Sequence, residues 1–423
     1  MLYERWRQIV QQHRNELALH DLVAGERLTF AELDSAVGVG DRSEEKILFP
    51  RGISDGFVVT VLRAWKAGQV VCPLEVEQTT PSFSRLPSGC VHLKSTSATT
   101  GAPRVVAFRA AQLMADAENI VTTMGLRPDW PNLGLISLAH SYGFSNLVLP
   151  LLLHGIPLIL VNSQLPEALR HALSIWPDLT LSGVPALWRV WHDAGAISSG
   201  IRLAISAGAP LPLALEQAVF SRSGIKIHNF YGATECGGIA YDTTCSPRTD
   251  PSCVGLPMRN VHLSVSDEGC LQVRSKAVGQ TYWPEPNSTL RHRSYQTSDL
   301  AELADGLVFL RGRVTDQINV AGRKISPELI ERVLLTHPKV RECLVFGVPS
   351  PNDPRGEIIV GCVAAQPGIQ VEDLKQFVFS KLAAWQVPRE WWFVDTLQTN
   401  QRGKLSRAEW RKKYLDERRG QRG

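Results

Sequence analysis

The sequence lacks an excess of charge of either sign and any ordered cysteine pattern. Its 423 residues carry 45 basic and 41 acidic side chains, for a formal net charge of +4, which is too balanced to indicate a nucleic-acid partner. The eight cysteines form no Cys-x-x-Cys pairs and have no histidine at metal-ligand spacing, so neither a disulfide framework nor a zinc site is indicated. We therefore expect reduced thiols and a cytoplasmic protein.

Long apolar runs are also missing. A membrane-spanning helix needs about 18 or more apolar residues, whereas the longest candidate, 147–161, is interrupted by prolines, a histidine and a glycine. This segment is typical of either two buried strands or a helix followed by a strand. The N-terminal residues 1–16 are amphipathic and charged, without the continuous apolar region of a secretory signal.

Short apolar runs alternate with helical patterns through residue 230, which predicts an α/β fold with parallel strands. Strands are expected at 46–49, 69–74, 134–137, 157–161, 180–182, 202–206 and 226–230. Helices are expected at 6–17, after a Thr29 cap, and at 57–67 before Gly68.

The pattern changes after about Ser252, where short alternating strands at 261–266 and 270–274 indicate a β-subdomain. Beyond Arg313 the pattern is that of a small α+β unit. It has expected strands at 317–320, 342–348 and 358–365 and helices at 327–336 and 371–382.

A chain of this length exceeds one ordinary hydrophobic core, so two or three domains are expected. We place a large N-terminal domain of layered α/β subdomains at 1–311, a hinge at 312–315 and a small C-terminal domain at 316–423. Much of the basic surplus lies in 407–422, where we expect a solvated or frayed end.

Residues 95–104, STSATTGAPR, combine five hydroxyl side chains with a glycine and a proline. Such a loop offers short hydroxyls and free backbone N–H groups that suit the oxygens of a phosphate chain. For an isolated loop of this composition, a solvated surface turn is the favoured interpretation. The segment is not a Walker A loop, since it has no G-x-x-x-x-G-K-S/T pattern.

Other short motifs are ambiguous when each is taken alone. In NFYGATE, 229–235, an aromatic ring, a hydroxyl and a carboxylate follow a predicted strand, and together they suit a base, a phosphate and Mg²⁺. A Tyr-Gly turn is the plain alternative. Asp299 fits a cap or turn, and the basic residues at 313, 323–324 and 404 fit solvated loops.

The order and spacing of these motifs remove the ambiguity. The chain resembles the adenylate-forming superfamily of acyl- and aryl-CoA synthetases, peptide-synthetase adenylation domains and beetle luciferases. Residues 95–104 resemble its phosphate loop, S/T-S-G-S/T-T-G-x-P-K, and 229–235 are similar to its Y-G-x-T-E motif. The segments 297–300 (TSDL), 312–331, 387–389 (VPR) and 401–407 (QRGKLSR) resemble its remaining signatures, so that the resemblance spans nearly the whole chain.

The resemblance implies an ATP site. Loop residues would hold the β- and γ-phosphates; these are Thr96, Ser97, Thr99, Thr100 and Gly101. Tyr231 would stack on adenine beside Gly232, with Asn229 near the adenine amino edge. Thr234 would contact the α-phosphate, and Glu235 would bind Mg²⁺.

The resemblance also assigns residues near the C-terminus. Asp299 would bind the ribose hydroxyls, with Arg313 beside it. Lys404 on the rotating small domain would approach the substrate carboxylate and the α-phosphate. After rotation of that domain, the segment containing Gly322 and Lys324 would reach the active site and form the tunnel for the thiol of CoA.

Three further segments are the predicted walls of the acyl pocket. The segment HSYGF, 140–144, matches the family's aromatic-histidine motif, in which His140 gates the site or is a packed core histidine. The remaining walls would come from 183–185 and 206–210. The predicted pocket residues are His140, Tyr142, Gly143, Ala207, Gly208 and Ala209. Such a pocket suits an aryl acid or a medium acyl chain, and no aspartate nearby would meet the ammonium group of an amino acid.

The chain departs from the family pattern at three positions. Ala98 replaces a loop glycine, Arg104 replaces the loop lysine, and Thr315 stands where an aspartate or lysine is usual in the hinge. Glycine tolerates backbone angles that alanine does not, and arginine keeps the charge of lysine without its geometry. We expect these changes to tune the activity.

The leading interpretation is therefore an ATP-dependent, AMP-forming ligase that converts a small carboxylic acid to a CoA thioester. The alternative is a stand-alone enzyme that loads the phosphopantetheine of an acyl or peptidyl carrier protein. A third possibility is a degenerate nucleotide-binding protein without ligase activity. The same residues would serve both ligase readings, so the sequence does not separate them.

Overall fold

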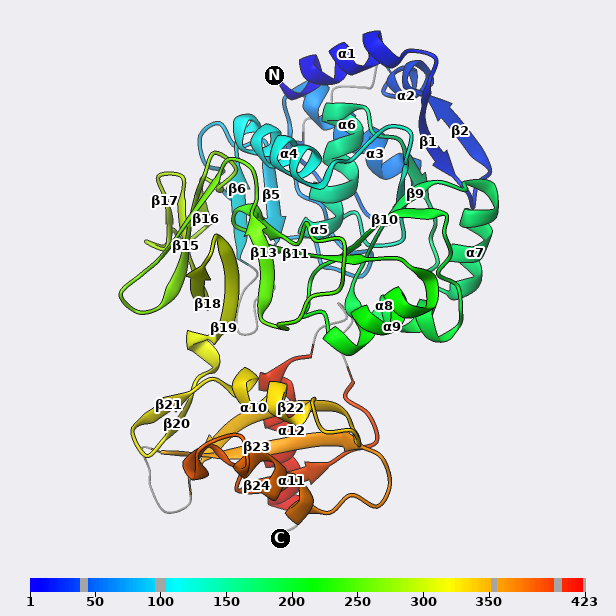
Figure 1. Cartoon of the computed structure of the whole chain (residues 1–423). Coiled ribbons are helices and arrows are strands. Elements are labelled where there is room, and N and C mark those ends of the chain that lie inside the picture. Colours follow the sequence, from blue (N-terminus) through cyan, green and yellow to red (C-terminus); the bar gives the residue numbers. More distant parts are fainter. Residues whose placement is uncertain (39–44, 96–103, 351–355, 399–404, 421–423) are drawn as a thin grey trace. The chain divides into compact units, whose positions relative to one another are not determined.

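The computed structural model describes residues 1–38, 45–95, 104–350, 356–398 and 405–420, and the chain divides into two compact units (Figure 1). The first unit comprises Met1–Ser264, Gln272–Gln296 and Leu303–Val308. The second comprises Val265–Leu271, Thr297–Glu302 and Phe309–Gly423. The residues predicted to form the hinge, 312–315, belong to the second unit, and their role as a hinge stays a prediction.

A run of parallel strands forms the centre of the first unit, as the alternating pattern predicted. In spatial order these are β1 (Leu17–Asp21), β8 (Leu158–Leu160), β7 (Asn132–Gly134), β9 (Leu179–Gly183), β10 (Ile201–Ser206) and β11 (Ile227–Ala233). Antiparallel strands flank the run: β2 (Glu26–Thr29) beside β1, and β12 (Gly237–Tyr241) followed by β13 (Cys253–Pro257) beside β11. Because both faces of a parallel sheet are covered, the strands are nearly continuous in apolar residues.

One face of this sheet is covered by α7 (Pro166–Ile175), α8 (Pro185–Asp193) and α9 (Leu213–Ser223). Trp188 and Trp191 of α8 are completely buried there against the strands. Gly183, at the end of β9, leaves room for them, since a Cβ atom at this position would lie 2.9 Å from the Trp191 ring. The packing of Trp188 and Trp191 against Gly183 therefore determines the path of the chain from β9 into α8.

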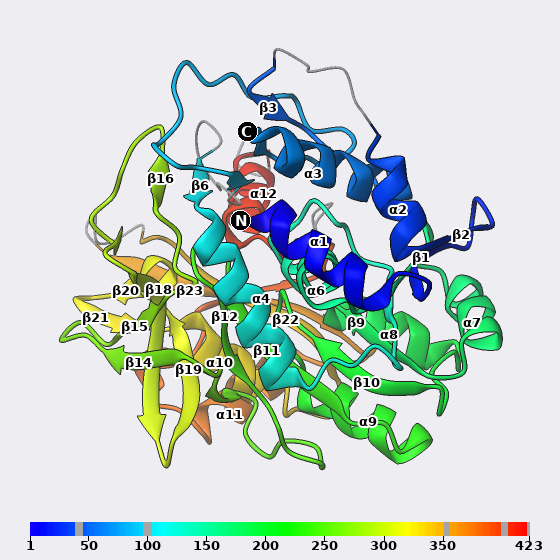
Figure 2. The same ribbon diagram turned by 90° about the horizontal axis from the view of Figure 1, so that it is seen from above.

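A second group of helices contains α1 (Leu2–His13), α4 (Ala110–Met124) and α6 (Leu149–His154), and the views agree that these three lie close together (Figures 1 and 2). The short α5 (Ser141–Gly143) and η1 (Phe144–Val148) precede α6. The segment 147–161 is thus a helix followed by β8, which settles the alternative left open by its composition. The predicted helix at 6–17 lies earlier than expected, because the chain turns after His13 and Leu17 already pairs with Thr29 in β1 and β2.

A smaller sheet contains the two strands on either side of the predicted phosphate loop. Its order is β16 (Thr281–Trp283), β6 (Val105–Phe108), β5 (His92–Ser95), β4 (Val70–Val71) and β3 (Ile47–Leu48). β5 and β6 are antiparallel, and Ser95 pairs with Val105. The chain therefore leaves β5 and re-enters β6 at neighbouring points of one sheet.

Two helices in the N-terminal part of the chain begin or end at the residues that the sequence predicted. Thr29 caps α2 (Phe30–Ala36) in a capping box with Glu32, as its sequence position predicted. α3 (Asp55–Ala67) ends at Gly68, whose φ of 71° lies in the left-handed region. Further strands follow β13, with the following bounds: β14 (Val261–Val265), β15 (Cys270–Ser275), β17 (Leu290–Arg291), β18 (Ser294–Ala304) and β19 (Leu307–Arg313).

The second unit is built on a three-stranded sheet of β22 (Val340–Pro349), β23 (Glu357–Ala365) and β24 (Glu390–Phe393). Alternate residues of β22 and β23 point to opposite faces. One face packs against α10 (Pro327–Leu334) and α11 (Val371–Phe379), and the other packs against α12 (Arg407–Gly420) (Figure 1). The remaining elements are η2 (Val314–Asp316), the hairpin of β20 (Ile318–Val320) and β21 (Arg323–Ile325), and η3 (Ala384–Gln386).

The prediction of a solvated or frayed tail from residue 407 onward is wrong. These residues form α12, in which Trp410 and Tyr414, one turn apart, are buried against β22 and β23. Arg407 begins the helix and binds three carboxylates, with nitrogen–oxygen distances of 2.9 Å to Asp316, 2.8 Å to Glu328 and 2.7 Å to Glu331. Because charged residues dominate this segment, its composition did not indicate that Trp410 and Tyr414 pack against the sheet.

Within the part of the chain that the structure covers, no helix combines the length and apolarity needed to cross a bilayer. The cysteines at all eight positions are unpaired thiols. Burial raises the pKa of Cys72 and Cys362 to about 12, so these thiols stay protonated at neutral pH.

His92 of β5 makes the stability of the first unit dependent on pH. The ring is completely buried, 4.3 Å from the Phe144 ring centroid, and neither ring nitrogen has a hydrogen-bond partner among the described residues. Burial, reinforced by the charge of Lys94, lowers the pKa of His92 well below 6.5. As the pH falls below 6.5 the unfolded state takes up a proton that the folded state does not, so stability is present above this pH and is lost below it.

Between pH 7.5 and pH 5.5, protonation of His92 in the unfolded state should lower the free energy of unfolding by about 1.4 kcal/mol. We expect His92→Leu to abolish this part of the pH dependence. Urea unfolding at both pH values measures this difference. His171→Leu, at an exposed position on α7, is the control and should leave the pH dependence as it is. An unchanged pH dependence in His92→Leu would contradict the assignment.

Candidate active site

Segments that the sequence assigned to the acyl pocket and to the nucleotide meet at the carboxyl ends of β9, β10 and β11. Ala207 follows β10 and donates its backbone N–H to the carbonyl of Gly183, at 3.1 Å. Asn229 is buried in β11 and pairs in register with Ser206. Ligands of open α/β sheets bind at this edge, where loops leave neighbouring parallel strands.

Residues 231–238 form the β11–β12 hairpin, whose turn carries Thr234 and Glu235. Tyr231 is half-buried in β11, and the strand register shifts between Tyr231 and Gly232. A Cβ atom at Gly232 would lie 2.8 Å from the carbonyl oxygen of Gly237, so only glycine fits this close approach of two strands. The turn residues therefore project from a closely paired hairpin.

The hydroxyl groups of Thr234 and Ser141 lie 3.1 Å apart, which joins the hairpin turn to α5. His140 precedes α5 as its N-cap, and its Nδ1 accepts the backbone N–H of Tyr142 at 3.3 Å. Gly143 has no space for a side chain, because a Cβ atom would lie 2.0 Å from the carbonyl oxygen of Ser137. Ser141 lies within the predicted HSYGF segment, but the sequence analysis assigned it no role of its own.

Tyr142 extends from α5 across the strands. Its ring centroid lies 5.9 Å from that of Phe230, and its hydroxyl donates to the carbonyl of Ile205 at 3.5 Å. Burial raises the pKa of Tyr142, so the hydroxyl stays protonated and available as a donor. Of the other predicted pocket residues, Ala207 is buried, Gly208 is exposed with a φ of +86° and Ala209 is partly buried.

Glu235 and Arg104 both contact Tyr282 of β16. The Tyr282 hydroxyl donates to Glu235 Oε1 at 2.9 Å, and the Arg104 guanidinium lies 4.8 Å from the Tyr282 ring centroid. Burial and the nearby Glu235 carboxylate raise the pKa of Tyr282, so the phenol remains a donor. This cation–π contact is one that arginine makes more often than lysine. No pattern in the sequence indicated Tyr282 as a site residue.

The side chains present fit Mg²⁺ held largely by a nucleotide. Among the described residues, no three His, Cys, Asp or Glu side chains gather as a complete metal site. Mg²⁺ is commonly bound by one or two carboxylates together with phosphate oxygens and water. Glu235, which accepts a hydrogen bond from Tyr282, would supply one such carboxylate.

Asp299, Arg313, Gly322 and Lys324 belong to the second unit. Arg313 Nε donates to Asp299 Oδ1 at 2.8 Å, so these two residues are neighbours, as their predicted joint role requires. Gly322 has a φ of +84° in the β20–β21 turn and donates its N–H to Asn319 Oδ1 at 3.0 Å, while Lys324 is exposed in β21. Thr315 donates its hydroxyl to Asp316 at 3.1 Å.

Several predicted residues lie outside the described part of the chain. They are Thr96, Ser97, Ala98, Thr99, Thr100, Gly101 and Lys404. Their roles stay predictions from the sequence. The structure does describe Ser95 and Arg104 on either side of the loop, and Arg407 three residues after Lys404.

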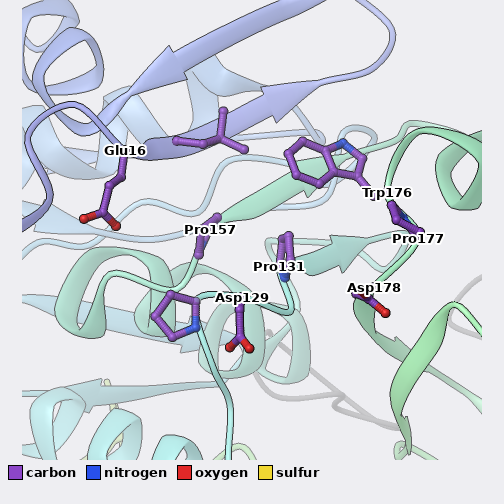
Figure 3. Close-up of a pocket in the computed structure, with 9 residues that line it drawn as sticks. Glu16, Asp129, Pro131, Pro157, Trp176, Pro177 and Asp178 are labelled. Carbon is purple, nitrogen blue, oxygen red and sulfur yellow. The ribbon is translucent and has the colours of Figure 1, made fainter.

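A surface pocket of about 330 Å³ lies at the other edge of the central sheet (Figure 3). Its lining residues precede or begin the strands, among them Glu16 before β1, Pro157 before β8 and Asp178 before β9. Four prolines and Trp176 give it an apolar wall. Because His140 follows β7 and Thr234 and Glu235 follow β11, at the carboxyl ends of the parallel strands, this pocket is separate from those predicted site residues.

Two family models match the chain, the AMP-binding enzyme model over residues 87–288 and the AMP-binding enzyme C-terminal domain model over residues 329–404. A feruloyl-CoA synthase from Amycolatopsis is 27% identical over 346 residues, which cover 76% of this chain and 69% of that protein. The fatty acid–[acyl-carrier-protein] ligase ScoC from Streptomyces coeruleorubidus is 30% identical over 277 residues, covering 58% of this chain and 52% of that protein.

The fold matches that of ATP-bound MatB from Rhodopseudomonas palustris, with a TM-score of 0.86 and 20% identity over 98% of this chain and 99% of MatB. The two models together account for both the α/β core and the small second unit. The chain therefore belongs to the adenylate-forming superfamily of AMP-binding enzymes.

Proposed function

We propose that the protein uses ATP to activate a carboxylic acid as an acyl-adenylate, releases pyrophosphate, and transfers the acyl group to the thiol of CoA. The observation that carries this proposal is the 3.1 Å contact between Ser141 and Thr234. It joins the segment predicted to border the acid to the residue predicted to contact the α-phosphate. Adenylation requires these two substrate groups to be adjacent.

A carboxylate is a poor nucleophile towards a polyanion, so positioning and charge stabilisation dominate the proposed catalysis. Mg²⁺ bound to ATP would neutralise phosphate charge. Glu235 would hold this ion, with Tyr282 fixing the carboxylate, while Thr234 donates its hydroxyl towards the α-phosphate. Asp299 would accept the ribose hydroxyls and Lys404 would supply positive charge at the reacting carboxylate.

An aryl acid or a medium acyl chain is the proposed substrate class. Tyr142 and Phe230 supply aromatic surface next to the Ser141–Thr234 contact, and small residues follow β10 at Ala207 to Ala209. Aromatic surfaces favour flat apolar ligands with ring centroids about 4.5–7 Å away. The name of the feruloyl-CoA synthase relative supports the same class.

A carrier protein is the second candidate acceptor, supported by the similarity to the ligase ScoC, whose name specifies an acyl carrier protein. Both acceptors present a thiol on a phosphopantetheine arm. The degenerate reading rests on Ala98 and Thr315. The retention of the family's motif residues, above all of Lys404 with its proposed role at the reacting carboxylate, counts against it.

The test is pyrophosphate release from Mg·ATP across a panel of benzoic, cinnamic, straight-chain and amino acids. We expect release with at least one aryl or medium-chain acid and none with amino acids. Thioester formation is then measured with CoA and, separately, with holo carrier protein. Thioester on the carrier alone would replace CoA by the second acceptor, and absence of release with every acid would overturn ligase activity in favour of the degenerate reading.

A further inference from the structure

Lys94 is a buried cation in the strand that enters the predicted phosphate loop. It is the third residue of β5, and its side chain is only 3% exposed. Its ammonium donates to Ser145 Oγ at 2.8 Å and to Asp116 Oδ2 at 3.4 Å, and Ser145 donates to the same Asp116 oxygen at 2.7 Å. We call Lys94, Asp116 and Ser145 the Lys94 cluster.

The cluster extends to the hairpin that carries Thr234 and Glu235. Asp116 on α4 uses its second oxygen, Oδ1, to accept the backbone N–H of Gly238 at 3.3 Å. Gly237 has a φ of +71°, and a Cβ atom there would lie 1.9 Å from Asp116 Oδ1. The hairpin backbone therefore lies directly on the aspartate, and only glycine permits this contact.

A contribution to folding stability does not by itself explain why the Lys94–Asp116 ion pair is buried at this position. The Lys94 ammonium also lies 4.9 Å from the Phe108 ring, among the apolar residues of β5 and β6. Replacing a buried ion pair by apolar residues of similar volume is often neutral or stabilising. What an apolar exchange at Asp116 would remove is the hydrogen bond that its Oδ1 accepts from the Gly238 N–H.

We propose that the Lys94 cluster is a positioning device for the nucleotide site. It fixes the hairpin that presents Thr234 and Glu235 relative to β5 and α4. Asp116 and Lys94 act through the backbone of these segments and do not themselves touch substrate. This inference rests on the proposed function, since the ligand positioned is Mg·ATP.

Two double variants separate positioning from packing. Lys94→Met with Asp116→Asn removes both charges but keeps an oxygen that accepts from Gly238. Lys94→Met with Asp116→Leu removes the charges and the acceptor together. Glu118→Leu on the exposed side of α4 is the matched control.

The measurements are the Kd of Mg·ATP by calorimetry, the KM values for ATP and for the acid, and the thermal midpoint. We expect the leucine variant to weaken Mg·ATP binding and raise the KM for ATP about 10-fold with the KM for the acid unchanged. The asparagine variant should stay close to the wild type in all four quantities. Should the leucine variant fail to fold, Lys94→Met with Asp116→Ala replaces it in the same comparison.

Equal ATP parameters in the leucine and asparagine variants would overturn the inference, as would a matching loss in the Glu118→Leu control. A rise in the KM for the acid alone would also overturn it. If the unsubstituted protein neither binds Mg·ATP nor releases pyrophosphate, the proposed function itself fails. If the unsubstituted protein does both and the leucine variant binds Mg·ATP equally well, only the inference about the Lys94 cluster fails.

Discussion

Lys404→Ala is expected to lower the rate of pyrophosphate release by about 100-fold or more. The reason is that this lysine, by its place in the G-K-x-x-R motif, would supply the positive charge next to the attacking carboxylate and the α-phosphate. Thioester formation from supplied acyl-adenylate should continue at nearly the rate of the unsubstituted protein, because that step no longer involves the pyrophosphate leaving group. The two half-reactions are measured separately on the same preparation.

Lys412→Ala is the control for this experiment, since Lys412 is an exposed lysine of α12 in the same unit. It should leave both half-reactions unchanged. Adenylate formation at the wild-type rate by Lys404→Ala would show that the lysine has a different role. An equal loss in both half-reactions would instead indicate damage to the small unit.

Lys226→Met is expected to destabilise the first unit by about 3–5 kcal/mol. Lys226 is buried between Glu216 and Asp242, 2.6 Å from the Asp242 carboxylate, and Arg248 binds Glu216 at 2.9 Å. Burial opposes ionisation of Asp242, but its hydrogen bonds to Lys226 and Thr244 outweigh this and lower its pKa. Removing Lys226 therefore leaves a buried carboxylate without its cation.

Thermal and urea unfolding of the first unit measure the effect. Arg127→Met provides the comparison, because the Arg127–Asp129 pair has both side chains more than half exposed, and exposed pairs contribute little to stability. Its unfolding midpoint should not change measurably. If the Lys226→Met protein had the same unfolding midpoint as the wild type, this would show that the buried charges are reorganised or hydrated.

Local signals allowed much of the fold to be predicted. The capping box of Thr29 and the glycine at 68 act within a few residues, so the helix boundaries they determine are readable in the sequence. Most of the parallel strands followed from their apolar runs, but β1 was not predicted, and the strand expected at 134–137 lies at Asn132–Gly134. The tail from 407 was misread because its core contacts come mainly from two aromatic residues, with a partly buried Leu415, among many charges, and because the partners of Arg407 lie 76 to 91 residues earlier.

In the candidate site, too, some residues could be predicted from the sequence and others could not. The motif residues could be named from their order, but the side chains that hold them could not. Ser141 meets Thr234 across 93 positions and Tyr282 meets Glu235 across 47. Tyr282 has no distinctive pattern around it, and Ser141 stands in a predicted motif without a role of its own, so only the folding of distant segments shows which residues they contact.

The position of α12 has a consequence for how the protein is made. The apolar side of β22 and β23 that includes Phe346 and Val360 is covered by Trp410 and Tyr414. During translation these strands leave the ribosome before α12 has been added. At about 5–20 residues per second, the interval lasts several seconds, during which an apolar strand surface faces solvent. The small unit is thus open to chaperone binding or to association with other nascent chains until residues 407–420 arrive.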